Sequence, residues 1–497
     1  MRRIPLCTGT HGPVSAPPRS QAARHDSTGE LKRTLTHRQT TMIGLGSALG
    51  TGLFLGSGTA IGIAGPAVIV AYLIGATLIA VIAVALGEMT IAHPERGSFG
   101  AIAHRYLGPW AGFLTRWLYW MGVVVVVGSE VVASAVYLRW WWPDIPLLAA
   151  ILAMAAIVVG VNLYSVKSFG VMEFWLSSLK VTAICVFLVC GALLVVFGLP
   201  GTEATGVHHL TDGSFLPHGV VSVWTAMSVV MFAFAGFETV AIAAAETTDP
   251  ARSMRTSMRQ LAWRLALFYV GSITLVITLS PWRQSAAGDG SVNSSPFVRL
   301  FAEIGIPAAA SLTNAVVLVA AVSSANAGLY ATSRLLHSLG HDRLAPRPVA
   351  RVNRRGVPVA AMLASAAGIG AAALLAAYGV GDIFSALTSI AIFAILLTWL
   401  LILASYIAFK RRRPAGEGVP GTAAFRLPGG TGTAVIGVIG VLAVLATAVE
   451  VPDMRRAATV GSVFTLFLGL AYSITHLRQA PHALTADREC QEDGPPA

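Results

Sequence analysis

The stretch GLGSALGTGLFLGSG, residues 44–58, has six glycines inside one of the first long apolar segments of the chain. Its Leu, Ala and Phe residues favour a buried helix, whereas each glycine in a helix interior costs about 1 kcal/mol relative to alanine. One explanation is close packing of helices, because glycines four positions apart let two helix backbones approach each other. Gly46 with Gly50, and Gly52 with Gly56, have this spacing.

A break in the helix is the second explanation, and the segment Gly50-Thr51-Gly52 favours it. Unwinding here would free backbone N–H groups at the positive start of the following half-helix, which is a natural seat for a carboxylate. The sequence therefore predicts a break at these three residues, with Gly46 and Gly56 serving packing. A dinucleotide-binding loop is excluded, because the spacing is G-x-G-x-x-x-G and no strand precedes it.

The composition predicts an all-α integral membrane protein. Of the 497 residues 55% are hydrophobic and 11% are charged, and the mean hydropathy is +0.70. Apolar runs of about 20 residues recur, each long enough to cross a hydrocarbon core as a helix. We expect twelve spans, at 43–62, 67–91, 110–138, 147–166, 171–198, 219–245, 262–280, 307–332, 357–378, 383–409, 433–450 and 458–477.

The formal net charge of +11 is explained by topology. With the N-terminus inside, most Lys and Arg residues fall on cytoplasmic segments such as HDRLAPRPVARVNRRG (341–356) and KRRRP (410–414). The exception is DMRR (453–456), between the last two expected spans. We therefore expect a multi-pass protein of the cell membrane with both termini cytoplasmic, whose basic residues meet anionic lipids and not nucleic acid.

The two tails are predicted from composition. Residues 1–40 have Pro, Ser and Arg without an apolar core, so we expect a disordered cytoplasmic tail and no cleaved secretory signal; an organellar transit peptide is the alternative. Residues 478–497 form a cytoplasmic C-terminal tail. Cys185 and Cys190 lie in one span, and Cys7 and Cys490 lie in opposite tails, so no disulfide framework is expected.

A second interrupted span lies five spans after the first. It is MFAFAGFETVAIAAAET (231–247), where Ala235 and Gly236 stand beside an intramembrane acid, Glu238. An odd number of spans per repeat gives two repeats of opposite orientation, which is typical of secondary transporters that bind substrate where two broken helices meet. The chain then divides into a first repeat at 41–198, a second at 218–410 and a closing helix pair at 432–477.

These motifs resemble the amino acid-polyamine-organocation (APC) superfamily, and specifically its bacterial amino acid transporter family. The resemblance runs from about Leu31 to about Arg478. It rests on the order of LTHRQTTMIGLGSALGTGLFLGSG (35–58), GEM (87–89), GSFGAIAHRYLG (97–108), YWMGVVVVVGSEVVASAVYLRWWWPDIP (119–146), VKSFGVMEFW (166–175), FAFAGFETV (232–240), ETTDP (246–250) and AVSSANAGLYATSRLLHSLG (321–340). It implies the 5+5 inverted-repeat (LeuT-like) fold, with helices 1 and 6 discontinuous and two helices added at the C-terminal end.

The resemblance also implies a substrate site. The substrate carboxylate would be held by Gly50, Thr51 and Gly52, and the amino group by carbonyls of Ala48, Phe232 and Ala235, beside Gly236. The ring of Phe232 would close over the substrate, and Glu238 would link occupancy to gating or protonation. Two half-helix ends supply donors to one end of a zwitterion and acceptors to the other.

Ionisable side chains inside spans are costly, so each one calls for an explanation. Lys180 aligns with a lysine that takes the place of a sodium ion in proton-coupled or uncoupled relatives; the alternative is a snorkelling or salt-bridged structural lysine. Glu130 could be a proton relay or the partner of a basic side chain. Ser323 and Ser324 would line the same ion region, although hydroxyl bonds to their own helix would explain them equally well.

The sequence thus predicts a secondary active transporter that imports amino acids by alternating access, as a proton-coupled symporter. Ala233, Phe234 and Ala235 favour neutral substrates. The alternatives are an amino acid exchanger and a transporter-like nutrient receptor. A membrane enzyme is not expected, because no converging catalytic set appears and the HH pair at 208–209 is a poor metal site. We expect no cofactor, metal site or catalytic residue.

Overall fold

The computed structural model describes residues 35–93, 97–198, 206–211, 214–286, 295–298, 307–377, 383–412, 425–447 and 450–492. Its regular structure in these ranges is helical. The longer helices are α1 (His37–Ala48), α4 (Val68–Ala92), α5 (Ser98–Leu107), α6 (Pro109–Arg139), α7 (Leu147–Tyr164), α8 (Val166–Phe197), α10 (Gly219–Ala233), α12 (Pro250–Leu279), α15 (Pro307–His341), α16 (Val359–Ala377), α17 (Ile383–Arg411), α18 (Gly430–Ala446) and α19 (Pro452–Glu492). The shorter ones are α2 (Thr51–Phe54), α3 (Gly56–Ala64), α9 (His208–Thr211), α11 (Thr239–Ala243) and α13 (Trp282–Ser285), with 3₁₀ turns at Gly65–Ala67, Ala244–Glu246 and Arg347–Ala350.

Eight described helical segments are long and apolar enough to cross a membrane. The first, Thr51–Ala92, joins α2, α3 and α4 and so covers parts of two expected spans. Three shorter apolar helices, Gly219–Ala233, Val359–Leu375 and Gly430–Ala446, lie over three further expected spans. All-helical membrane architecture is therefore confirmed, while the count of twelve spans stays a prediction.

Several helix boundaries differ from those expected from the sequence. Two of the helices begin where a side chain caps the first turn. Thr36 and Gln39 form a capping box at the start of α1, inside the expected tail 1–40; residues 1–34 lie outside the described residues. Asp249 caps α12, with Pro250 at the first helical position, so this helix begins twelve residues before the expected span 262–280. The backbone of α19 continues to Glu492, into the expected C-terminal tail, and residues 493–497 lie outside the described part.

Both helices that the sequence marks as interrupted are broken in the structure. The first helix ends at Ala48 and resumes at Thr51, so Leu49 and Gly50 form the break and Thr51 and Gly52 already belong to the second half. The sixth helix ends at Ala233 and resumes at Thr239. Gly236 lies in that second break with φ of +105°, which favours glycine.

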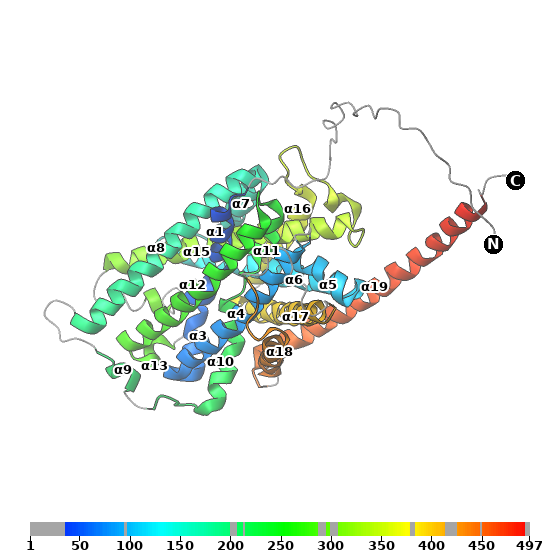
Figure 1. Ribbon diagram of the computed structural model, residues 1–497. Coiled ribbons are helices and arrows are strands. Elements are labelled where there is room, and N and C mark those ends of the chain that lie inside the picture. The colour runs from blue at the N-terminus through cyan, green and yellow to red at the C-terminus, as the bar shows by residue number, and fades with distance from the viewer. Residues whose placement is uncertain are drawn as a thin grey trace, which may run out of the picture.

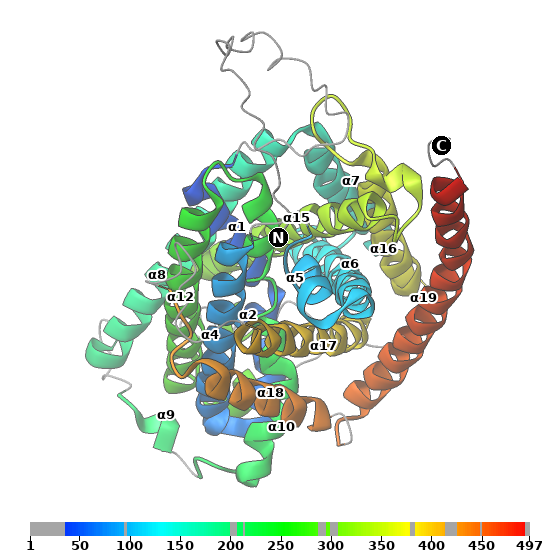
Figure 2. The same cartoon turned by 45° about the vertical axis from the view of Figure 1, so that its right-hand side comes forward.

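The bundle is organised around α6, which packs against α5, α15, α16 and α17. Figures 1 and 2 show α8 and α19 on opposite sides of this centre, with α18 and α19 beside α17. The peripheral helices expose large apolar side chains, for example Trp175 and Phe197 of α8 and Leu466 of α19, which are 68%, 72% and 74% exposed. Such faces are stable in contact with lipid and not with water, which fits an integral membrane protein.

Candidate functional site

A small cavity lies where the two broken helices meet. Its volume is about 20 Å³, room for roughly one water molecule. The side chains around it must therefore move apart to admit a larger ligand. Nine of the residues named in the sequence analysis line it: Ala48, Gly50, Gly52, Glu130, Phe232, Ala233, Ala235, Gly236 and Ser324.

The carbonyl groups freed at the end of α1 are met by side chains from three other helices. A helix end leaves its last four carbonyls without partners in the helix itself. Ser324 Oγ of α15 donates to Ser47 O at 3.3 Å, and Tyr269 Oη of α12 donates to Ala48 O at 2.7 Å. Lys180 of α8 serves this turn as well. Long-range contacts from three helices therefore stabilise the break, in addition to the local backbone bonds from Leu49 N to Leu45 O and from Gly50 N to Ala48 O.

Lys180 is fully buried, so it does not snorkel to the surface. Its Nζ donates to Gly46 O at 2.5 Å and to Leu49 O at 3.2 Å. Two buried carboxyl groups, Glu173 and Glu130, attract its charge. Lys180 thus bonds to the end of α1 and interacts electrostatically with Glu173 of its own helix, α8, and with Glu130 of α6.

Glu173 is held by a network of polar side chains. It accepts hydrogen bonds from Ser323 Oγ, from Ser177 Oγ at 3.2 Å and from Asn326 Nδ2 at 2.9 Å. Asn162 Nδ2 in turn donates to Asn326 Oδ1 at 2.7 Å. Ser323 therefore lies near Lys180 through its bond to Glu173, and its predicted role in the ion region stays a prediction.

Glu130 of α6 binds the positive end of the second half-helix. The amide nitrogen of Thr51 donates to both carboxyl oxygens of Glu130, at 3.1 and 3.3 Å. The hydroxyl of Thr51 is buried and has no hydrogen-bond partner among the described residues. A buried hydroxyl without a partner is unfavourable, so a ligand group that forms a hydrogen bond with it would be stabilised here.

Glu238 lies at the second break and does not line the cavity. Its Oε2 accepts from the amide nitrogen of Gly236 at 3.2 Å, and the Tyr119 hydroxyl and the Trp399 indole lie next to its carboxyl group. Because Tyr119 also lines the cavity, it links Glu238 to the space between the breaks. Tyr119 therefore lies between the carboxyl group of Glu238 and the cavity.

The helix ends nearest the N-terminal end of α1 are tied together by a buried group of residues, the Arg334 cluster: Leu35, Phe169, Glu246, Tyr330 and Arg334. Leu35 N donates to Glu246 O at 3.0 Å, and Arg334 pairs with the Glu246 carboxylate at 2.9 Å. The guanidinium lies 4.0 Å from the centroid of the Tyr330 ring, which stacks on Phe169 at 4.2 Å. This cluster joins the start of α1 to α8, to the 3₁₀ turn Ala244–Glu246 and to α15.

Two further ion pairs join helix ends. One lies at the C-terminal ends of α4 and α17, and the other joins the first turns of α6 to the residue after α15. The Glu88 carboxylate accepts from Lys410 Nζ at 2.5 Å, from Tyr406 Oη at 2.7 Å and from the amide nitrogen of Leu427 at 3.1 Å. Arg116 pairs with Asp342 at 2.5 Å. Lysine and arginine therefore also serve inter-helix contacts at the end where the sequence places most of the basic charge.

The glycines of the first helix serve different purposes. A Cβ on Gly46 would overlap Ser177 and Glu173 of α8, so this glycine permits close packing, as predicted. A Cβ on Gly56 would meet only Val229 Cγ1, at 3.8 Å, so the expected packing role of Gly56 is wrong. A Cβ on Gly52 would lie 2.8 Å from Ala233 Cα, because the two broken helices cross there.

Several residues of the site were given another role by the sequence prediction or were not named in it. Ala233, not Phe232, supplies the helix 6 carbonyl that a side chain reaches, since Phe232 O accepts from the amide nitrogen of Ala235. Glu173 could have been found, because an acid inside a span calls for an explanation. Tyr119 and Tyr269 carry no such signal, since buried tyrosines are common in helix bundles.

Comparison with known proteins identifies similar chains. Residues 39–478 match the family described as amino acid permease. A permease of Bacillus subtilis strain 168, YtnA, is 36% identical over 445 residues, 89% of this chain and 95% of its own. The gamma-aminobutyric acid permease of the same organism is 42% identical over 68% of this chain and 72% of its own. The D-serine/D-alanine/glycine transporter of Escherichia coli K12 is 37% identical, over 77% and 82% respectively.

Proposed function

The chain belongs to the amino acid permease family, and we propose on this premise that it is a secondary active transporter that imports amino acids across the cell membrane. The observation that carries the proposal is the cavity between the two helix breaks, which is lined by half-helix ends of both polarities. A zwitterion needs donors for its carboxylate and acceptors for its ammonium, and these ends supply both without net charge.

The proposed seat of the substrate carboxylate is the start of α2. The amide and hydroxyl of Thr51 are donors there, and the hydroxyl has no hydrogen-bond partner among the described residues. Glu130 takes the amide in this structure. We propose that the substrate carboxylate replaces that of Glu130, because two carboxylates on one amide repel each other.

The proposed seat of the ammonium is the group of carbonyls at the ends of α1 and α10, with Phe232 closing over the substrate. Ala48, Ala233 and Ala235 leave small, uncharged walls on this side of the cavity. Such walls support neutral substrates. The names of two relatives, a gamma-aminobutyric acid permease and a D-serine/D-alanine/glycine transporter, support the same class.

Proton coupling is proposed to run through Lys180, Glu130 and Glu173. Lys180 bonds to carbonyls of the first break, while Glu130 binds the amide that the substrate needs. A proton on Glu130 would weaken its hold on Thr51 and would favour substrate entry. This linkage supports symport, since proton and substrate then bind more tightly together than separately.

Twelve spans and a five-plus-five inverted repeat are part of the proposal, as is alternating access. The Arg334 cluster is the proposed cytoplasmic gate, because it joins the start of α1, the end of the sixth helix and α15. Glu238 is proposed to signal occupancy to this gate, since α11 and the 3₁₀ turn Ala244–Glu246 lead from Glu238 to Glu246.

The test is uptake by purified protein in proteoliposomes with an imposed proton gradient. Labelled substrates are tested one at a time, and the twenty amino acids and 4-aminobutyrate are added unlabelled as competitors. We expect saturable uptake that the gradient drives and that neutral amino acids inhibit. Uptake that needs internal amino acid and ignores the gradient would indicate an exchanger. Binding without flux would indicate a receptor, and neither binding nor flux would refute the proposal.

A further inference from the structure

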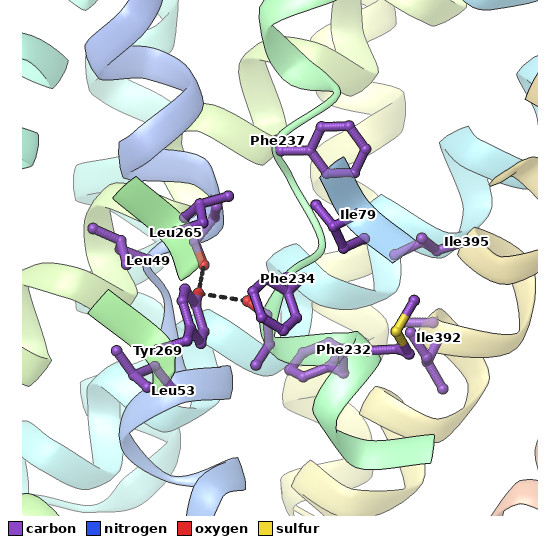
Figure 3. Close-up of a cluster of buried hydrophobic side chains, with 14 of the residues drawn as sticks. Leu49, Leu53, Ile79, Phe232, Phe234, Phe237, Leu265, Tyr269, Ile392 and Ile395 are labelled. Carbon is purple, nitrogen blue, oxygen red and sulfur yellow. Dashed lines mark hydrogen bonds between the residues drawn. The ribbon is translucent and has the colours of Figure 1, made fainter. Parts of the chain in front are cut away.

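Tyr269 joins the two helix breaks through a single hydroxyl group. It is fully buried on α12, and its Oη lies 2.7 Å from Ala48 O and 2.6 Å from Ala233 O. Figure 3 shows both bonds, with the ring of Tyr269 beside Phe234. Ala48 and Ala233 are the last residues of α1 and α10. One side chain from a third helix therefore meets the C-terminal ends of two half-helices.

This place is short of hydrogen-bond donors. A tyrosine hydroxyl has one proton, so it serves two carbonyls only by sharing that proton. The amide nitrogen of Gly50 adds one donor to Ala48 O, at 3.0 Å. Both carbonyls also carry the negative partial charge of a helix C-terminal end, so they repel each other. A cation with several N–H groups would be stabilised between them.

The ring of Tyr269 is held in place by its neighbours. It stacks on Phe234, in the second break, at 4.5 Å between centroids, and on Tyr72 of α4 at 6.2 Å. The position of the hydroxyl is therefore fixed by α4, α12 and the sixth helix together. Ala48 and Ala233 line the cavity, whereas Tyr269 does not.

We infer that Tyr269 is a positioning residue for amine recognition: it holds the carbonyls of Ala48 and Ala233 together so that both can accept from a primary ammonium. This inference rests on the proposed function. A primary ammonium has three N–H groups and can donate to both carbonyls, whereas an N,N-dimethyl ammonium keeps one N–H group and can donate to only one of them. The two hydrogen bonds of the Tyr269 hydroxyl therefore favour substrates with an unsubstituted ammonium group.

The test compares Tyr269→Phe with Tyr72→Phe. Both variants keep the aromatic ring and the stack, and both remove one buried hydroxyl. The Tyr72 hydroxyl has no hydrogen-bond partner among the described residues, so its loss is the matched control. The probes are the amino acid that wild-type protein binds best in the competition panel, its N-methyl derivative and its N,N-dimethyl derivative.

We expect Tyr269→Phe to bind the free amino acid about ten- to a hundredfold more weakly, the effect of one charge-assisted hydrogen bond. Affinity for the dimethyl derivative should change less than threefold, so the preference for the free amine falls at least about threefold. Tyr72→Phe should keep the wild-type preference. Thermal stabilisation of the purified variants by each probe gives the same comparison without transport.

Two outcomes overturn the inference. One is that Tyr269→Phe binds all three probes as tightly as wild type does, and the other is an equal loss of affinity for all three probes, which would make the tyrosine merely structural. Failure of the proposed function is distinguishable from both, because wild-type protein would then bind no amino acid of the panel.

Discussion

The crossing of the two broken helices makes Gly52 the most sensitive position for a small substitution. A Cβ at Gly52 would lie 2.8 Å from Ala233 Cα, 3.3 Å from Ala233 N and 3.1 Å from Phe232 Cδ1. Two of these three atoms belong to the main chain of α10, so no rotation of a side chain relieves the overlap. In Gly52→Ala the start of α2 must move away from the end of α10.

The magnitude follows from this overlap. One extra methyl group in a well-packed interior costs about 1 to 3 kcal/mol. Since each 1.4 kcal/mol is tenfold in an equilibrium constant, uptake at low substrate concentration should fall about 5- to 150-fold. Gly52→Val adds two more carbons at the same place, and we expect it to abolish uptake while membrane insertion stays intact.

Gly56→Ala is the matched control, because the same methyl group is added four residues further along the same broken helix. Its Cβ would meet only Val229 Cγ1, at 3.8 Å, which is ordinary van der Waals contact. We expect uptake within twofold of wild type. Initial uptake rates in proteoliposomes, corrected for the amount of monodisperse protein, provide the measurement. Wild-type uptake by Gly52→Ala would refute the assignment of the substrate seat to this crossing.

Three further predictions concern the second break, Lys180 and the Arg334 cluster. Gly236→Ala should lower uptake about tenfold or more in the same assay, because φ is +105° and the new Cβ would lie 2.6 Å from Ser47 O; normal uptake would contradict this. Lys180→Ala should make uptake independent of an imposed proton gradient while counterflow persists, and an unchanged gradient dependence would reject the coupling role. Arg334→Leu should destabilise the protein by about 3 to 5 kcal/mol, since it leaves Glu246 as an unpaired buried charge. The double variant Glu246→Gln/Arg334→Leu should lose less stability in thermal unfolding, because it removes that charge. An equal loss of stability in the single and the double variant would argue against the ion pair.

The sequence was informative about the breaks because helix weakness is a local property. Glycines at 50, 52 and 236 can be recognised without any knowledge of their neighbours in space. The exact break was less predictable: it lies at Leu49 and Gly50, where side chains from α8, α12 and α15 meet the freed carbonyls. Those partners are 131 to 277 positions away in the chain.

The candidate site was predicted in part for the same reason. Lys180 and Glu130 stand out because charge inside an apolar span is costly, and this cost is visible in a single segment. Their partners are not visible there. The bond from Thr51 to Glu130 joins helices 79 positions apart, and Tyr269 meets Ala48 across 221 positions.

The sequence by itself therefore determined an all-helical membrane protein of the amino acid permease family with two weak points in its helices. These properties depend on composition, hydropathy and the preferences of single residues, which act over one or two turns. Only the tertiary structure decided that Glu130 binds the amide of Thr51 and that the Tyr269 hydroxyl bonds to the carbonyls of Ala48 and Ala233 at the two breaks. Hydrogen bonds of this kind require atoms within about 3 Å of each other, and such distances are set by the packing of whole helices.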